Sequence, residues 1–261
     1  MPRVPHPNKE IESALRFVQS RGWKIIEGGG HCWGKLYCPW NSANCRCGEF
    51  CIVSIWSTPK DPSNFARLIK RVVKNCAIEK AVSGGMDPDT EHPMNYEFTL
   101  KFQVSDRHDI DALLECLALH GCDDTLVGIG QPGRLALSFD REASSADQAI
   151  QSALSDVQRA VPTAILIEAT PDLVGLTDVA ELIGVSRQNM RKLMLVHSID
   201  FPPPVHQGRT CLWHLADILA WLHKRGTYPV RQHVIELAHS AMVINIRTAY
   251  ERVFGAVKPA S

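Results

Sequence analysis

One stretch decides how this chain is organised: residues 176–193, which read LTDVAELIGVSRQNMRKL. The stretch predicts two short helices joined by a tight turn. We expect Thr177 to cap the first helix, and its inward-facing residues to be Val179, Ala180, Leu182 and Ile183. Gly184 permits the left-handed conformation that ends this helix, and Val185 fills the turn. The pattern therefore indicates a helix-turn-helix.

The second helix of this pair carries the chemistry. Ser186 is its predicted cap, and Met190 and Leu193 face the core. The outward residues are Arg187, Gln188, Asn189, Arg191 and Lys192. Forked guanidinium donors suit guanine, an amide suits adenine, and cations suit phosphates. We expect this helix to contact DNA, although a small helical bundle with surface arginines would have a similar composition.

The residues that follow predict a wing and a third helix. Residues 201–213 read as two strands around a basic tip that contains Arg209, and residues 215–224 read as a helix. Across residues 176–225 the chain resembles the excisionase or MerR-like winged helix-turn-helix family. The resemblance implies DNA as the partner. The expected DNA-binding residues are Ser186, Arg187, Gln188, Asn189, Arg191, Lys192 and Arg209.

A long helix is expected after Tyr228-Pro229 and extends to about Phe254. One apolar stripe runs along it, formed by Ile235, Ala238, Met242, Ile246, Ala249 and Val253. Such a stripe packs on its own chain or on a second copy. The sequence leaves both open, so a homo-oligomer through this helix is one of the expected partners.

Charge is distributed unevenly along the 261 residues, although Lys plus Arg and Asp plus Glu are equal at 28 each. Residues 1–93 hold 13 basic against 9 acidic side chains, residues 94–172 hold 5 against 13, and residues 173–261 hold 10 against 6. This pattern is typical of ordinary variation among solvated surfaces. It also fits basic lobes that face nucleic acid, with an acidic segment covering one of them.

Targeting features are not evident in the sequence. We find no apolar run long enough to span a bilayer, and residues 1–10 lack the apolar core of a signal peptide. We therefore expect a cytoplasmic protein without membrane contact. Nine cysteines in such a compartment are read as reduced thiols or metal ligands.

Four cysteines lie close together as C-x6-C-x-C-x3-C: Cys38, Cys45, Cys47 and Cys51. Four thiolates can hold zinc, but no regular CxxC pair is present. We expect free thiols here and no cofactor in the chain.

The N-terminal residues predict an αβββα module of the double-stranded-RNA-binding type. A helix at 9–20 is followed by strands at 23–27, 31–37 and 50–56, and by a helix with Asp61 as its predicted N-cap and Pro62 in its first turn. The apolar stripe of that last helix is Phe65, Leu68, Ile69, Val72 and Val73. A second stripe is basic and is our predicted RNA-binding face: Arg67, Lys70, Arg71 and Lys74.

Residues 9–76 resemble the HicA family of toxin ribonucleases. The resemblance rests on Gly22-Trp23, on the turn 28–30 followed by His31, and on the run WGKLY at 33–37. It implies that His31 is a catalytic general acid and base. Lys24 and Lys35 would then stabilise the developing phosphorane-like charge.

This sequence departs from the HicA pattern in two ways. A cysteine-bearing insertion separates the second and third strands, and Cys32-Trp33 stands beside the histidine. A surface that binds RNA without cleaving it is therefore the alternative.

The middle segment alternates strand and helix in the order βαββαβ, the ferredoxin-like pattern. Its expected elements are strand 96–104, helix 109–120, strands 124–130 and 133–140, helix 145–160 and strand 163–169. His108 and His120 are expected at helix ends, where a surface role is favoured over catalysis. The segment reads as an acidic packing or pairing module.

The chain is thus expected to be a multidomain α+β protein. The predicted parts are a HicA-like module at 1–82, a linker at 83–93, an acidic ferredoxin-like module at 94–171, a winged helix-turn-helix at 172–227 and a C-terminal helix at 228–261. As a function we expect a fused toxin and antitoxin: an mRNA-cleaving ribonuclease neutralised by the acidic module and autoregulated through DNA. The alternatives are a non-enzymatic transcriptional regulator and a recombination directionality or phage-related architectural factor.

Overall fold

The structure is a computed structural model that describes residues 3–28, 30–39, 48–74, 76, 95–104 and 109–255. The chain divides into two compact units. The sheet unit comprises residues 1–142 and 151–167, and the helical unit comprises residues 143–150 and 168–261.

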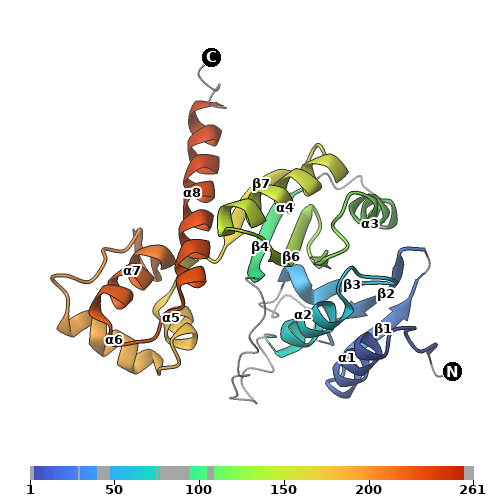
Figure 1. Cartoon of the computed structure of the whole chain (residues 1–261), viewed down its shortest axis with the longest axis horizontal. Helices are drawn as coiled ribbons and strands as arrows, with labels where there is room; N and C mark the ends of the chain where they lie inside the picture. The colour runs from blue at the N-terminus through green and yellow to red at the C-terminus, as the bar shows by residue number, and fades with distance from the viewer. Residues whose placement is uncertain are drawn as a thin grey trace. The chain divides into compact units, whose positions relative to one another are not determined.

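The sheet unit begins with a helix that the sequence predicted to the residue, α1 (Lys9–Ser20). The Asn8 side chain accepts hydrogen bonds from the backbone N–H groups of Glu10 and Ile11, which fixes the start of the helix. Three strands and a second helix follow: β1 (Lys24–Glu27), β2 (Cys32–Tyr37), β3 (Ile52–Trp56) and α2 (Pro62–Lys74), with a short 3₁₀ segment, Gly48–Cys51, before β3. The predicted cap of α2 is confirmed, because Asp61 accepts from the N–H of Asn64 at 3.0 Å. α1 and α2 lie side by side (Figure 1).

The acidic segment continues the sheet unit. It contains β4 (Asn95–Gln103), α3 (Ile110–Leu119), β5 (Thr125–Gly128), β6 (Arg134–Glu142), α4 (Ala146–Ala160) and β7 (Ile165–Thr170). β4 and β6 pair antiparallel over their whole lengths, from Asn95 opposite Glu142 to Gln103 opposite Arg134. The element order is the predicted one, and no boundary differs from its predicted position by more than two residues.

Among the described residues, seven strands form one sheet in the order β1-β2-β3-β5-β6-β4-β7 (Figure 1). The join is between β3 and β5, where Val53 lies opposite Gly128. The Trp56 indole N–H donates to the carbonyl oxygen of Thr125 at 2.7 Å across the same join. A Cβ at Gly128 would lie 2.6 Å from the carbonyl oxygen of Glu49, so only glycine permits this close approach.

This continuous sheet differs from the sequence interpretation, which placed residues 1–82 and 94–171 in separate modules. Val53, Ile55 and Trp56 of β3 are buried, as is every residue of β5. β3 is therefore a central strand with neighbours on both sides, and the N-terminal strands share their core with the acidic segment.

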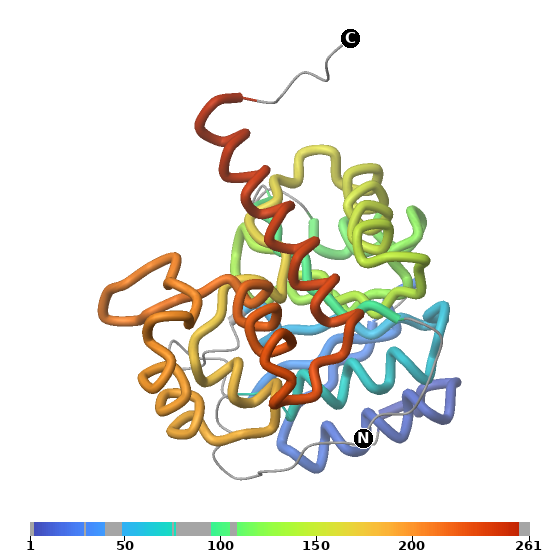
Figure 2. The backbone as a smooth tube through the Cα atoms, turned by 60° about the vertical axis from the view of Figure 1, so that its left-hand side comes forward, coloured from blue at the N-terminus to red at the C-terminus, as the bar shows by residue number. Residues whose placement is uncertain are grey.

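The helical unit contains the helix-turn-helix. Its elements are β8 (Leu173–Val174), α5 (Leu176–Leu182), α6 (Arg187–Val196), β9 (His206–Gln207), β10 (Cys211–His214), α7 (Leu215–Arg225) and α8 (Gln232–Phe254). In the described part of this unit, three strands pair in the order β8-β10-β9. Figure 2 shows α8 as one unbroken helix.

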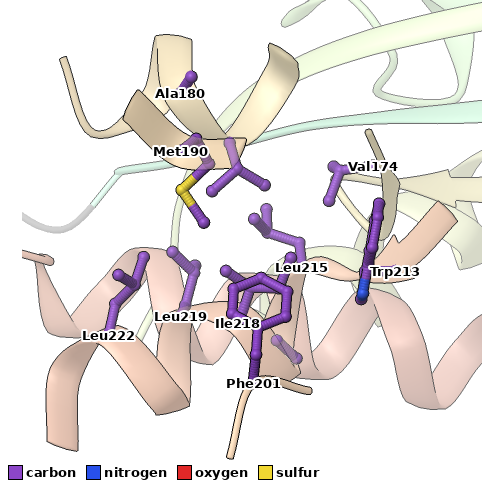
Figure 3. Packing of buried hydrophobic residues seen from close by; sticks show 12 residues of the cluster. Val174, Ala180, Met190, Phe201, Trp213, Leu215, Ile218, Leu219 and Leu222 are labelled. Carbon is purple, nitrogen blue, oxygen red and sulfur yellow. The ribbon is translucent and has the colours of Figure 1, made fainter. Parts of the chain in front are cut away.

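The core of the helical unit contains side chains from the helices α5, α6, α7 and α8 and from β8 and β10. Met190 of α6 packs with Leu219 and Leu222 of α7, and Phe201 meets Trp213 edge-to-face at 6.2 Å (Figure 3). Gly184 has φ +73°, and Val185 N–H donates to the carbonyl oxygen of Ala180 at 2.9 Å. The turn predicted between the two helices is thus confirmed.

Three details of the helical unit correct the sequence interpretation. Thr177 is not the cap of α5: Gly175 is, and Asp178 accepts from the Gly175 N–H at 2.8 Å. Leu182 is 44% exposed rather than inward. The wing strands begin later than residue 201, since Pro202–Pro204 lack the N–H groups that a ladder needs.

The fold as observed is α+β, with a mostly antiparallel sheet. Among the described helices, none combines the length and the apolar character that crossing a bilayer requires.

Candidate nucleic-acid interfaces

The outer face of α6 is the first candidate interface. The Ser186 hydroxyl accepts a hydrogen bond from the Asn189 N–H at 3.1 Å, as the sequence predicted. Met190, on the inner face of α6, is fully buried. The predicted DNA-contacting residues of this helix are all exposed: Ser186, Arg187, Gln188, Asn189, Arg191 and Lys192. Within the part of the chain that the structure describes, Arg187, Arg191 and Lys192 form no ion pair. Their positive charge is therefore not compensated by a neighbouring carboxylate.

The wing adds Arg209 to the same unit. β9 and β10 form a hairpin in which Cys211 lies opposite Gln207. Arg209 lies at the exposed tip of this hairpin, between the two strands. The Trp213 indole N–H donates to the carbonyl oxygen of Pro202 at 3.1 Å, which ties the proline run to β10.

A buried polar network that the sequence did not predict anchors β10, α7 and α8. The Asp172 carboxylate is 1% exposed and accepts from His214 Nδ1 at 2.6 Å and from Asn245 Nδ2 at 2.7 Å. The Asp172 carbonyl accepts from Leu215 N–H at 2.7 Å, and Asn245 also bonds to both backbone polar groups of Ala169. A carboxylate buried in this way is stabilised by its several donors. The network fixes the point where β10 ends and α7 begins.

His31 is the second candidate site, and it lies in the turn before β2. The Ser57 backbone N–H donates to the His31 carbonyl oxygen, and the Ser57 hydroxyl donates to the Gly30 carbonyl oxygen, both at 2.8 Å. The His31 side chain is 50% exposed, and its Nδ1 lies 2.5 Å from Glu115 Oε1. The backbone of this turn is thus held by Ser57, and the imidazole is paired with α3.

Lys35 forms a second contact between β2 and α3. Its ammonium lies 2.7 Å from Asp111 Oδ1, one helical turn before Glu115. Two carboxylates of the acidic segment therefore pair with His31 and Lys35, which the sequence had assigned to RNA. Lys24 is exposed at the other end of the β1–β2 hairpin, opposite Tyr37, so the structure does not bring it to His31.

The basic stripe of α2 also meets carboxylates. Arg67 pairs with Glu97 of β4 and with the buried Asp140 of β6, and Arg71 pairs with Glu97. The other two residues of the stripe are Lys70, half-buried, and Lys74, exposed. The stripe is formed as predicted, but its two arginines are bound by the acidic segment.

The cysteine cluster lies only partly within the described residues. The Cys38 N–H donates to the Cys51 carbonyl oxygen at 2.8 Å, and both side chains are buried. Cys45 and Cys47 lie outside the described residues. Among those that the structure describes, no group of three or more histidine, cysteine or acidic side chains is placed to hold a metal ion.

Two other thiols have perturbed acidity. Burial raises the pKa of Cys32, which neighbours His31. Burial, together with the nearby Asp156 and Asp124, raises the pKa of Cys122 to about 12. Neither thiol is therefore poised as a thiolate nucleophile at neutral pH.

The predicted stripe of α8 divides into two parts. Ala238 is buried, and Ile235 and Met242 pack against the core of the helical unit. Farther along, Ile246 is 52% exposed and Val253 is 72% exposed. The first half of the helix serves the core, and the second half presents apolar side chains to its surroundings.

The chain was compared with protein-family models, curated proteins and solved structures. None of them matches it. The assignment of function therefore depends on the geometry described above.

Proposed function

We propose that this chain is a fused toxin and antitoxin: the helical unit binds operator DNA, and the sheet unit is a HicA-like ribonuclease whose basic residues are neutralised within the same chain. The observation that carries the DNA-binding part is the outer face of α6. Its cations have no carboxylate partner among the described residues, while Met190 holds the opposite face in the core. A helix anchored in this way offers charge and hydrogen-bond donors to a major groove.

The element order supports the modules proposed for each part. The helical unit has the element order of a winged helix-turn-helix: α5, the turn at Gly184, α6 and the β9–β10 hairpin. The order β7-β4-β6-β5 is the 4-1-3-2 arrangement of a ferredoxin-like sheet. The first five main elements follow the αβββα order of a double-stranded-RNA-binding fold.

The DNA-binding part is tested by selecting duplexes from a random-sequence library with the full chain and measuring affinity for the selected duplex. Replacing both Arg191 and Lys192 by Ala should lower affinity at least tenfold and reduce its dependence on salt, because phosphate contacts release counterions. Arg134→Ala is the matched control, since Arg134 is an exposed arginine of β6 in the sheet unit. Equal affinity of the wild type and the double variant would contradict the proposal.

The ribonuclease part is supported by the ion pairs of the sheet unit. A histidine can transfer protons between the ribose 2′-hydroxyl and the leaving oxygen, and lysine or arginine can stabilise the developing charge. Here Glu115 contacts His31, and Asp111 pairs with Lys35. Glu97 pairs with both Arg67 and Arg71. We infer that these carboxylates compete with RNA phosphates for the same cations.

Neutralisation is tested in the full chain, because β3 is shared between the N-terminal strands and the acidic segment. Asp111→Asn with Glu115→Gln should increase cleavage of a single-stranded RNA oligonucleotide at least tenfold. Glu142→Gln with Asp147→Asn removes two exposed carboxylates elsewhere and is the charge-matched control. No gain over this control would contradict neutralisation by α3.

A non-enzymatic regulator is the second candidate. It is favoured by the 2.5 Å contact of His31 with Glu115, which occupies one ring nitrogen. This candidate predicts RNA binding without cleavage in every variant, so the same assay separates the two.

Pairing of two chains through the second half of α8 also belongs to this proposal. A dimer would contact two half-sites of a palindromic operator. Both activities would operate in the cytoplasm, where operator DNA and mRNA are found.

A further inference from the structure

The C-terminal end of α6 and the turn after it expose three large apolar side chains. Leu195 is 59% exposed, Val196 is 65% exposed and Ile199 is fully exposed. Single exposed apolar residues are common, but three within five residues of the chain make this segment a candidate interaction site. The partner of this site follows from the residues that surround it.

The backbone that presents these side chains is well anchored. Phe201 N–H donates to the His197 carbonyl oxygen at 2.8 Å, and the Trp221 indole N–H donates to Asp200 Oδ2 at 3.2 Å. Phe201 also packs edge-to-face on Trp221, with ring centroids 5.0 Å apart. The turn after α6 is thus fixed against α7, and the exposure of Leu195 is a property of the folded unit.

Helix geometry places Leu195 on the DNA-facing side of α6. It follows Arg191 by four residues and Gln188 by seven, so the three side chains share one face. Met190, on the opposite side, is fully buried. Leu195 is therefore an apolar group within a face that is otherwise cationic or amidic.

We propose that Leu195 packs against the C5-methyl group of a thymine in the operator and so helps to determine its sequence. This inference rests on the proposed DNA binding. Thymine presents a C5-methyl group in the major groove, and apolar side chains recognise it by direct contact. The neighbouring Arg191 and Lys192 have no carboxylate partner among the described residues, so the face attracts a polyanion rather than an apolar protein surface.

The experiment uses the full chain and the duplex selected from a random library. Affinity is measured for the wild type and for Leu195→Ala, on the duplex and on versions in which one thymine at a time is replaced by uracil. One uracil substitution should weaken the wild type about fourfold, the value of burying one methyl group. Leu195→Ala should bind the thymine duplex more weakly than the wild type does, by at least the same factor. Its affinity should not change when that same thymine is replaced by uracil.

Leu119→Ala is the matched control, because Leu119 is 66% exposed on α3 in the other unit. It should bind as the wild type does. Thermal unfolding of each variant should match the wild type, since an exposed leucine contributes little to folding.

Several results would overturn the inference. If Leu195→Ala binds the duplex as tightly as the wild type while Arg191→Ala still weakens binding, this inference is overturned. The proposed DNA binding would stand in that case. An equal loss on thymine and uracil duplexes, or a change of oligomeric mass in Leu195→Ala, would assign the side chain to another partner. If no duplex is enriched from the library, the proposed DNA binding fails and this inference fails with it.

Discussion

Basic residues of the sheet unit and of α6 differ in whether carboxylates pair with them. Arg67, Arg71 and Lys35 are bound to carboxylates, and His31 lies against Glu115. Among the described residues, Arg187, Arg191 and Lys192 of α6 have no such partner. A basic stripe in a sequence therefore identifies a cationic surface only when no acidic segment of the same chain covers it.

The ion pairs of the sheet unit are mostly at the surface, where a single pair contributes about 0–1 kcal/mol. They are weak enough to be exchanged for phosphates, and under the proposed function each one would lower the affinity for RNA. The difference between the two regions is thus a difference in available charge, and it can be altered by substituting carboxylates.

The largest effect is expected at His31. In the Asp111→Asn, Glu115→Gln background, His31→Ala should reduce RNA cleavage by about 10²–10⁴-fold, because general acid and base catalysis is lost. RNA affinity should persist, since Lys35 and the α2 arginines remain. Cleavage rates and binding are measured on the same oligonucleotide, and equal cleavage with and without His31 would exclude its catalytic role.

At α6, Arg191→Ala should weaken binding to the selected duplex by about 1–3 kcal/mol if Arg191 contacts a base edge. The same variant should leave RNA binding by the sheet unit unchanged. Affinities for both nucleic acids are compared by fluorescence anisotropy. A loss of RNA binding as large as the loss of DNA binding would show that the two regions do not act separately.

Acid should lower the free energy of unfolding of the sheet unit by protonating Glu12. Burial alone would raise the pKa of Glu12, but hydrogen bonds from Arg3, the His6 backbone and Arg16 lower it to about 2 from the ordinary 4.5. The stabilisation is therefore present above about pH 4.5 and is lost as the pH falls toward 2. Thermal unfolding should show a smaller difference between wild type and Glu12→Gln at pH 2 than at pH 6, with Glu142→Gln as the control. A difference that is independent of pH would argue against this assignment.

The smallest effect concerns thiols of the sheet unit. Cys116 is exposed, whereas Cys32 and Cys122 are buried and their pKa values are raised. Brief alkylation of the native protein near pH 7.5, mapped by mass spectrometry, should modify Cys116 well before the other two. Faster modification of Cys32 would mean that the turn at His31 opens readily.

Local patterns were predictable from the sequence. The limits of α1, the cap of α2 at Asp61 and the cap of α6 at Ser186 depend on residues within one helical turn, and all three are observed. The core position of Met190 follows from helix periodicity in the same way.

The individual long-range contacts were not predictable, although the charge pattern did suggest that the acidic segment covers a basic lobe. The β3–β5 join brings together two segments whose strand patterns are complete in themselves, so nothing in either one indicates the other. Glu97 and Glu115 look like ordinary surface acids in sequence. Asp172 finds His214 at a separation of 42 residues and Asn245 at 73, and none of the three lies in a motif. Contacts of this kind depend on the tertiary fold.

The central claim is that, among the described residues, the cations of α6 have no carboxylate partner, whereas Lys35, Arg67 and Arg71 of the sheet unit are paired with carboxylates. The most direct test is the salt dependence of binding of the full wild-type chain to the selected DNA duplex and to a single-stranded RNA oligonucleotide, with the Asp111→Asn, Glu115→Gln variant measured beside it. The account predicts a steep salt dependence for DNA in both proteins. For RNA it predicts weak binding in the wild type, and in the variant tighter binding with a slope steeper by about 0.7, the value for one more phosphate contact to a single strand, made by Lys35. Strong RNA binding by the wild type, with no change in the variant, would contradict it.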